Sequence, residues 1–149
     1  MNLGKHAILL FSTGFYLGNL RFAPGTFGSL PGIPLWFALL TVGPRFAWVL
    51  LALFVVFAVG IAHASSKLLQ QKDPGCIVID EIAGMAVTIA GLPFSWPACI
   101  AGFVLFRIFD IAKPFPISWA DQRVSGVLGI VLDDILAGVM SNITLRIIF

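Results

Sequence analysis

One stretch of the chain sets charged residues among apolar ones: residues 106–123 read Phe-Arg-Ile-Phe-Asp-Ile-Ala-Lys-Pro-Phe-Pro-Ile-Ser-Trp-Ala-Asp-Gln-Arg, and an apolar run then leads to Asp133-Asp134. Only 11% of the chain is charged, yet this stretch holds Arg107, Asp110, Lys113, Asp121, Arg123, Asp133 and Asp134. A carboxylate at the centre of a bilayer costs about 2.5–3.5 kcal/mol, so a membrane segment that carries one usually does so for function. The adjacent aspartates therefore predict a functional site, with a cation or the membrane edge relieving the cost.

The composition predicts a membrane protein with a single domain, residues 1–149. Hydrophobic residues make up 59% of the chain and the mean hydropathy is +1.02, whereas a soluble domain is about 45–50% apolar and about 25% charged. A net charge of +2 without a basic run argues against a nucleic-acid partner. Cys76 and Cys99 lack a Cys-x-x-Cys spacing, so they suit neither zinc nor a disulfide framework.

The hydropathy pattern predicts an all-α, polytopic integral membrane bundle with short re-entrant or interfacial helices. Residues 46–64 carry no charge. At about 1.5 Å per residue, this run can cross a hydrocarbon core of about 30 Å. The run 126–148 predicts a last helix with Asp133-Asp134 near its middle.

Shorter elements are expected between these helices. The apolar runs predict helices at 7–20, 33–43, 82–92 and 97–112. Glycine and proline predict a loop at 21–32. In the polar piece 65–79, Ser65-Ser66 could start a short helix. The capping-box spacing of Ser118 and Asp121 predicts another short helix that opens there.

The distribution of Lys and Arg predicts the orientation in the membrane. The turns at 44–45 and 93–97 are expected on one side, and the loops 21–32, 65–81 and 107–125 on the other. The second side holds the greater number of basic residues: Arg21, Lys67, Lys72, Arg107, Lys113 and Arg123. Because positive charge prefers the cytoplasm, the charged loops are predicted to be cytoplasmic.

Four carboxylates are the candidate metal ligands: Asp80, Glu81, Asp133 and Asp134. Hard oxygen ligands without histidine or cysteine suit Mg²⁺ better than zinc. The alternative is that the first pair only complements a helix dipole and that the second pair is an accidental polar face. The small residues Ala137 and Gly138 argue against that second alternative, because they allow a neighbouring helix or ligand to approach closely.

Arg107, Asp110 and Lys113 are spaced three apart and share one face of a helix. They could form a plain salt-bridge ladder, but beside the carboxylates they predict a shared site. Paired carboxylates with Arg and Lys are what metal-assisted phosphoryl transfer requires. The loop 24–29 could offer backbone N–H groups to a phosphate, but it lacks a Walker spacing, and as a bare pattern it better suits a turn with Ser29 as an N-cap.

Four motifs in order resemble the phosphatidylglycerophosphatase A family, and they cover the chain nearly end to end. They are Pro-Gly-Thr-Phe-Gly-Ser-Leu (24–30), Ile-Val-Ile-Asp-Glu-Ile-Ala-Gly-Met (77–85), Phe-Arg-Ile-Phe-Asp-Ile-Ala-Lys-Pro-Phe-Pro-Ile (106–117) and Gly-Ile-Val-Leu-Asp-Asp-Ile-Leu-Ala-Gly (129–138). The resemblance implies a bacterial inner-membrane enzyme of phosphatidylglycerol biosynthesis. Such an enzyme uses Mg²⁺ to remove the terminal phosphate of phosphatidylglycerophosphate.

The expected roles follow from the residues and the resemblance together. The carboxylates Asp80, Glu81, Asp133 and Asp134 are expected to hold Mg²⁺, and Asp110 to orient the cations or join the metal shell. The expected phosphate-binding residues are Arg107, Lys113, Thr26, Ser29 and Arg123. Water activated by the metal is the expected nucleophile, and an aspartyl-phosphate route stays open.

Two alternative functions stay open at this point. A small ion or proton transporter would also carry intramembrane carboxylates. The clustering of the acids with Arg and Lys on one side favours the enzyme. A phosphatase for another lipid phosphate would share the same site chemistry and differ only in the headgroup that it accepts.

Overall fold

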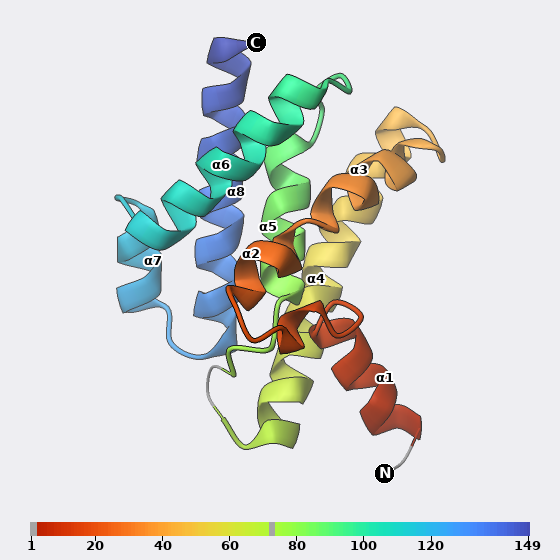
Figure 1. The fold of residues 1–149 in the computed structure, drawn as a ribbon, viewed down its shortest axis with the longest axis vertical. Helices are drawn as coiled ribbons and strands as arrows, with labels where there is room; N and C mark the ends of the chain where they lie inside the picture. Colours follow the sequence, from red (N-terminus) through yellow and green to blue (C-terminus); the bar gives the residue numbers. More distant parts are fainter. Residues whose placement is uncertain (1–2, 72–73) are drawn as a thin grey trace.

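The computed structural model describes residues 3–71 and 74–149, and every regular element in this described part is a helix (Figure 1). The elements are α1 (Leu3–Ser12), the 3-10 turn η1 (Leu17–Asn19), α2 (Pro24–Ser29), α3 (Gly32–Leu40), α4 (Pro44–Leu69), α5 (Ile79–Ile89), α6 (Trp96–Ala112), α7 (Ile117–Arg123) and α8 (Val127–Ile148). The predicted all-α class is confirmed. The helices α4 and α8 have 26 and 22 residues, and both are long and apolar enough to cross a membrane.

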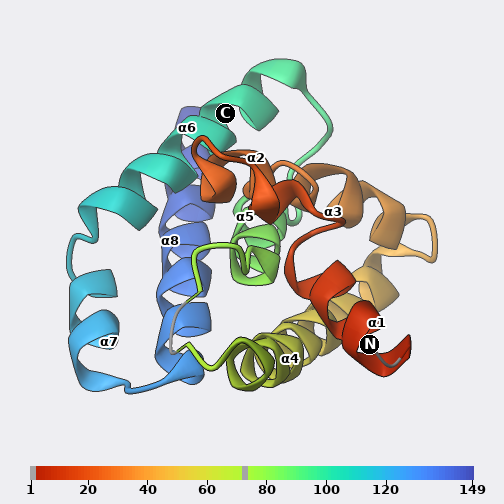
Figure 2. The same ribbon diagram turned by 60° about the horizontal axis from the view of Figure 1, so that its bottom comes forward.

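The short helix α5 lies at the centre of the bundle, where it packs against α2, α3, α4, α6 and α8 (Figures 1 and 2). It meets α8 closely because both helices carry glycine at the crossing. A Cβ on Gly138 would lie 2.4 Å from the carbonyl oxygen of Gly84. A Cβ on Gly84 would lie 2.7 Å from the carbonyl oxygen of Asp134. Contact between the two backbones therefore fixes the acidic first turn of α5 beside Asp134.

The carboxyl end of α5 is capped by α8. The last carbonyls of a helix have no partner within that helix. An 11-residue helix is too short to carry these groups through the roughly 30 Å hydrocarbon core. The side-chain amide of Asn142 donates to the carbonyls of Val87, Thr88 and Ala90, at 3.2, 2.8 and 2.9 Å. Arg146 also donates to Ala90, at 3.1 Å. Polar side chains of α8 thus satisfy a helix end that apolar surroundings would penalise.

The long predicted helices are confirmed, and two of the short predicted elements are wrong. The expected loop 21–32 contains α2, which starts with Pro24 at a position where proline's missing N–H costs nothing. The polar residues after Ser65 continue α4 to Leu69 instead of starting a new helix. Lys72 and Asp73, which belong to the same predicted polar piece, lie outside the described residues.

The predicted boundaries of two further helices also need correction. The predicted helix 7–20 ends at Ser12, because Gly14, Phe15 and Tyr16 take positive φ angles of 56°, 56° and 70°. The short helix predicted near Ser118 is confirmed as α7, but its capping box is wrong, since the N-cap residue is Pro116, two residues before Ser118, and no side chain caps the helix.

Candidate active site

Three carboxylates meet where the first turn of α5 faces α8. One oxygen from each of Asp80, Glu81 and Asp134 lies within 4.8 Å of the others. Asp80 and Asp134 are only 4% exposed. Like charges this close oppose one another's ionisation unless a cation joins them. The donor set and its spacing therefore fit a hard divalent cation.

Glu81 is the half-buried member of this acidic cluster. Its Oε2 atom is buried and has no hydrogen-bond partner among the described residues. Burial raises the pKa of Glu81 well above its ordinary value, and the neighbouring Asp80 carboxylate raises this pKa further. A buried carboxylate oxygen without a hydrogen-bond partner, on a residue of an acidic cluster, is suited to bind a cation.

Arg107 of α6 faces the acidic cluster across the first turn of α2. Its guanidinium donates to Asp110 at 2.5 Å, the pairing that a salt-bridge ladder along α6 would also contain. The buried Nε atom of Arg107 has no hydrogen-bond partner within the described part of the chain. A Cβ on Gly25 would lie 2.5 Å from Glu81 Oε1 and 3.5 Å from both terminal nitrogens of Arg107. Gly25 therefore lets the backbone of α2 approach both groups, a role that the sequence motif contains but that its pattern does not single out.

The prediction that Lys113 shares a helix face with Arg107 and Asp110 is wrong, because α6 ends at Ala112 and Lys113 takes a left-handed conformation. Lys113 instead pairs with two carboxylates from different helices. Its Nζ lies 2.7 Å from Asp121 of α7 and 2.5 Å from Asp133 of α8. Burial alone would lower the pKa of Lys113, but the hydrogen bonds to Asp121 and Asp133 outweigh it and raise the pKa. Lys113 therefore carries its positive charge at neutral pH.

The structure brings together three of the four expected metal ligands and places the fourth differently. Asp133 is bonded to Lys113 and is absent from the group of carboxylates that converge within 4.8 Å in the described residues. Among the expected phosphate-binding residues, Thr26 lines a shallow groove together with Arg107. Ser29 is fully buried, and its hydroxyl donates to the Thr26 carbonyl at 2.9 Å. It ends α2 and is no N-cap. Arg123 is exposed at the end of α7.

The fold and the site together define an all-helical protein with membrane-length helices and with buried carboxylates opposite an arginine, a set of groups that suits phosphoryl-transfer chemistry. Comparison with known proteins agrees with this class. The family model for phosphatidylglycerophosphatase A matches residues 10–149, and the chain belongs to that family.

Curated relatives cover most of the chain. This chain is 44% identical over 137 residues to "Phosphatidylglycerophosphatase A" of Escherichia coli strain K12, and the match covers 89% of this chain and 77% of the relative. It is 37% identical over 138 residues to the protein of the same name from Haemophilus influenzae, covering 91% and 85%. A Bacteroides thetaiotaomicron protein named "Putative phosphatidylinositol-3-phosphatase" is 38% identical over 147 residues, covering 93% and 91%. No solved structure matches the chain significantly.

Proposed function

We propose that this enzyme hydrolyses the terminal phosphate of phosphatidylglycerophosphate, which leaves phosphatidylglycerol and inorganic phosphate. Membership of the family and the names of two relatives support this reaction. The observation that carries it is the placement of Gly25 between Glu81 and Arg107. This contact sets a phosphate-binding cation directly beside the acidic cluster.

Mg²⁺ is the cofactor we propose for this acidic cluster, with Asp80, Glu81 and Asp134 as its protein ligands. The fit rests on three converging carboxylates and on the unpartnered Oε2 of Glu81 within the described residues. When bound, a divalent cation polarises a phosphoryl oxygen and neutralises charge that develops on it. Asp133 is left out of this ligand set because Lys113 occupies it.

The basic residues hold the substrate phosphate in this proposal. Arg107 offers a planar fork of donors that matches phosphate oxygens in two places. Asp110 holds that fork in position through its hydrogen bond. Lys113 contributes a fixed positive charge at the edge of the site, because two carboxylates keep it protonated. Thr26 lies beside Arg107 and can donate its hydroxyl to the same phosphate.

The site is proposed to face the cytoplasm from a bacterial inner membrane. The carboxyl end of α4 and the connection between α7 and α8 lie toward the end of the bundle opposite the C-terminus (Figure 1). The basic residues Lys67 and Arg123 lie in the last turns of α4 and α7, which end there, whereas Arg45 and Arg146 belong to the other end. Positive charge favours the cytoplasmic side.

A second candidate substrate differs from phosphatidylglycerophosphate in its headgroup. The Bacteroides relative is named as a phosphatase of a phosphoinositide, so related proteins are named after different lipid substrates. Phosphate release by purified protein from phosphatidylglycerophosphate, phosphatidic acid and phosphatidylinositol 3-phosphate, with and without Mg²⁺, tests the proposal. We expect phosphatidylglycerophosphate to be preferred by at least about tenfold in kcat/KM, or roughly 1.4 kcal/mol. A preference for either other lipid would contradict the proposed substrate.

A further inference from the structure

A shallow apolar groove runs along α6 and leads to the candidate active site. It has a volume of about 450 Å³, within the range of about 300–1,000 Å³ that ligand sites occupy. Apolar side chains of α6 form its length, and Thr26 of α2 closes one side. The lining residues are Thr26, Phe103, Val104, Arg107, Ile108, Ile111 and Ala112.

Arg107 belongs both to this groove and to the site. Arg107 is the charged residue among those that line the groove, and its guanidinium lies next to Gly25 and is bonded to Asp110. From Arg107, the groove continues past Phe103 and Val104 toward the amino end of α6. The groove therefore joins a phosphate-binding cation to an apolar path of about one helical turn.

We propose that this groove holds an acyl chain of the phospholipid substrate, which reaches the site sideways from the lipid. The proposal rests on the proposed function, because it assigns the apolar part of the same substrate. A phosphate held by Arg107 places the aliphatic chain beside Phe103 and Val104. The exposed residues Ile100 and Val104 on the same side of α6 are 62% and 48% exposed. They continue the apolar surface toward the membrane.

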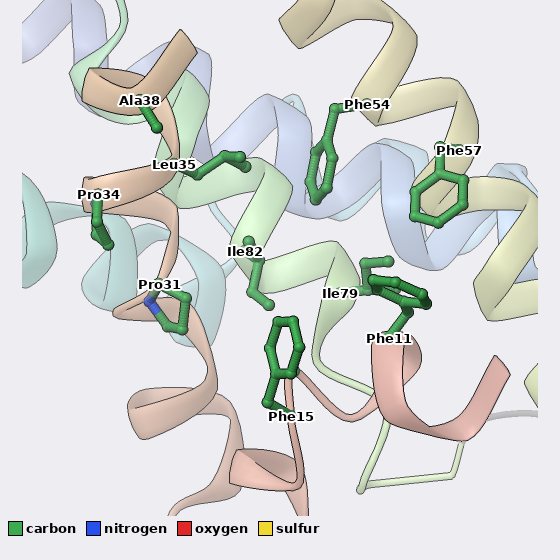
Figure 3. A pocket seen from close by; sticks show the side chains of 11 residues that line it. Phe11, Phe15, Pro31, Pro34, Leu35, Ala38, Phe54, Phe57, Ile79 and Ile82 are labelled. Atoms are coloured by element: carbon green, nitrogen blue, oxygen red, sulfur yellow. The ribbon is translucent and has the colours of Figure 1, made fainter. Parts of the chain in front are cut away.

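A second apolar cavity lacks a charged residue that could hold the phosphate of the same lipid. It has a volume of about 570 Å³ and lies between α1, α3, α4 and α5 (Figure 3). Ile79 and Ile82 point into it, as Figure 3 shows. At 3.6 residues per turn, Asp80 and Glu81 face away from Ile79 and Ile82. A chain in this cavity would meet no charged residue among those that line it.

Filling the groove tests the proposal through substrate selectivity. Val104 is half exposed, so Val104→Trp adds bulk to the groove without burying it in the core. The matched control is Val56→Trp on α4, where Val56 is 69% exposed and lines none of the cavities described here. The measured quantity is the ratio of kcat/KM for long-chain phosphatidylglycerophosphate to kcat/KM for glycerol 3-phosphate. We expect Val104→Trp to lower this ratio at least about tenfold and Val56→Trp to leave it within about twofold.

A photocrosslinking measurement decides the proposal even if the enzyme hydrolyses neither substrate. The probe is phosphatidic acid with a diazirine in its acyl chain. We expect it to label the α6 peptide that contains Phe103 and Val104. Excess unlabelled phosphatidic acid should compete, and phosphatidylcholine should not. If the enzyme releases no phosphate but unlabelled phosphatidic acid competes with the labelling, the proposed function is overturned and the assignment of the groove stands.

Three results would overturn the groove itself. The first is an unchanged selectivity ratio in Val104→Trp together with labelling that phosphatidylcholine displaces equally well. The second is labelling of the α6 peptide that survives unchanged in Val104→Trp. The third is a selectivity ratio that falls in Ala38→Phe, which fills the cavity of Figure 3, and does not fall in Val104→Trp. That last result would move the acyl chain to the far side of α5.

Discussion

The Nζ of Lys113 lies 2.5 Å from the Oδ2 of Asp133, whereas the adjacent Asp134 joins the carboxylates of α5. Two neighbouring aspartates on one helix therefore have separate roles. Asp133 links the turn after α6 to α8 through its ion pair with Lys113, and Asp134 is the α8 member of the acidic cluster. The difference arises because consecutive residues of a helix point about 100° apart, so the two side chains meet different neighbours.

Asp133→Asn should destabilise the protein while leaving its response to Mg²⁺ intact. The amide can still accept a hydrogen bond, but it loses the charge that Lys113 faces in a buried position, at a cost of about 1–3 kcal/mol. The control is Asp121→Asn, whose carboxylate is 46% exposed and whose pair is worth about 0–1 kcal/mol. Melting curves in detergent with and without Mg²⁺ measure both effects. Loss of the Mg²⁺ response in Asp133→Asn would place Asp133 among the metal ligands after all.

Gly25→Ala should impair catalysis with little effect on folding. The added methyl group would lie 2.5 Å from Glu81 Oε1, so the carboxylate or α2 must move. A misplacement of about 1 Å at an active site can cost about 10²-fold in rate. Gly60→Ala is the matched control, since a Cβ there meets nothing within 4 Å and alanine favours a helix by about 0.5–1 kcal/mol. Equal kcat/KM for the two variants would show that the close approach of α2 has no catalytic role.

Arg107→Lys should keep thermal stability near that of the parent protein and lose at least about tenfold in kcat/KM, or roughly 1.4 kcal/mol. The substitution keeps the charge beside Asp110 but loses the planar fork that grips phosphate in two places. The paired measurement is a melting curve and phosphate release from phosphatidylglycerophosphate. A large drop in melting temperature with unchanged specific activity of the folded fraction would reduce Arg107 and Asp110 to a structural salt bridge.

Cys76 reports the orientation of the site. Cys76 is partly exposed, and Cys99 is buried, so a membrane-impermeant thiol reagent should react with Cys76 selectively. We expect labelling in inverted vesicles and none in intact cells, because the connection that carries Cys76 is predicted to be cytoplasmic. Cys76→Ser should abolish the signal. Labelling confined to intact cells would reverse the orientation.

The sequence predicts which charged residues come together better than it predicts the partner of each one. The apolar runs mark α4 and α8 directly, because a membrane span needs length and hydropathy, and both can be counted in a sequence. The acidic and basic motifs likewise point to Asp80, Glu81, Asp134 and Arg107. The sequence cannot separate Asp133 from Asp134, since that distinction depends on which neighbour each side chain meets.

Contacts between distant segments explain the other differences. Asn142 caps α5 although more than 50 positions separate it from the carbonyls that it bonds. A lone polar residue in an apolar helix signals such a role only weakly. The residues 21–32 look like a loop because glycine and proline disfavour helices. Tertiary contact overrides that preference in α2, where Gly25 must approach Glu81 and Arg107 closely.

The most direct test of the metal site is Mg²⁺-dependent phosphate release from phosphatidylglycerophosphate by the parent protein and by Asp134→Asn. The parent protein should be inactive after chelation with EDTA and regain activity when Mg²⁺ is added. Saturating Mg²⁺ at about 100 times its Kd should also stabilise it by about 2.7 kcal/mol. Asp134→Asn should stay folded, lose at least about 100-fold in kcat, as removal of a transition-state contact does, and show no stabilisation by Mg²⁺. Full activity of the parent protein in EDTA, or near-normal turnover by folded Asp134→Asn, would contradict the proposed metal site.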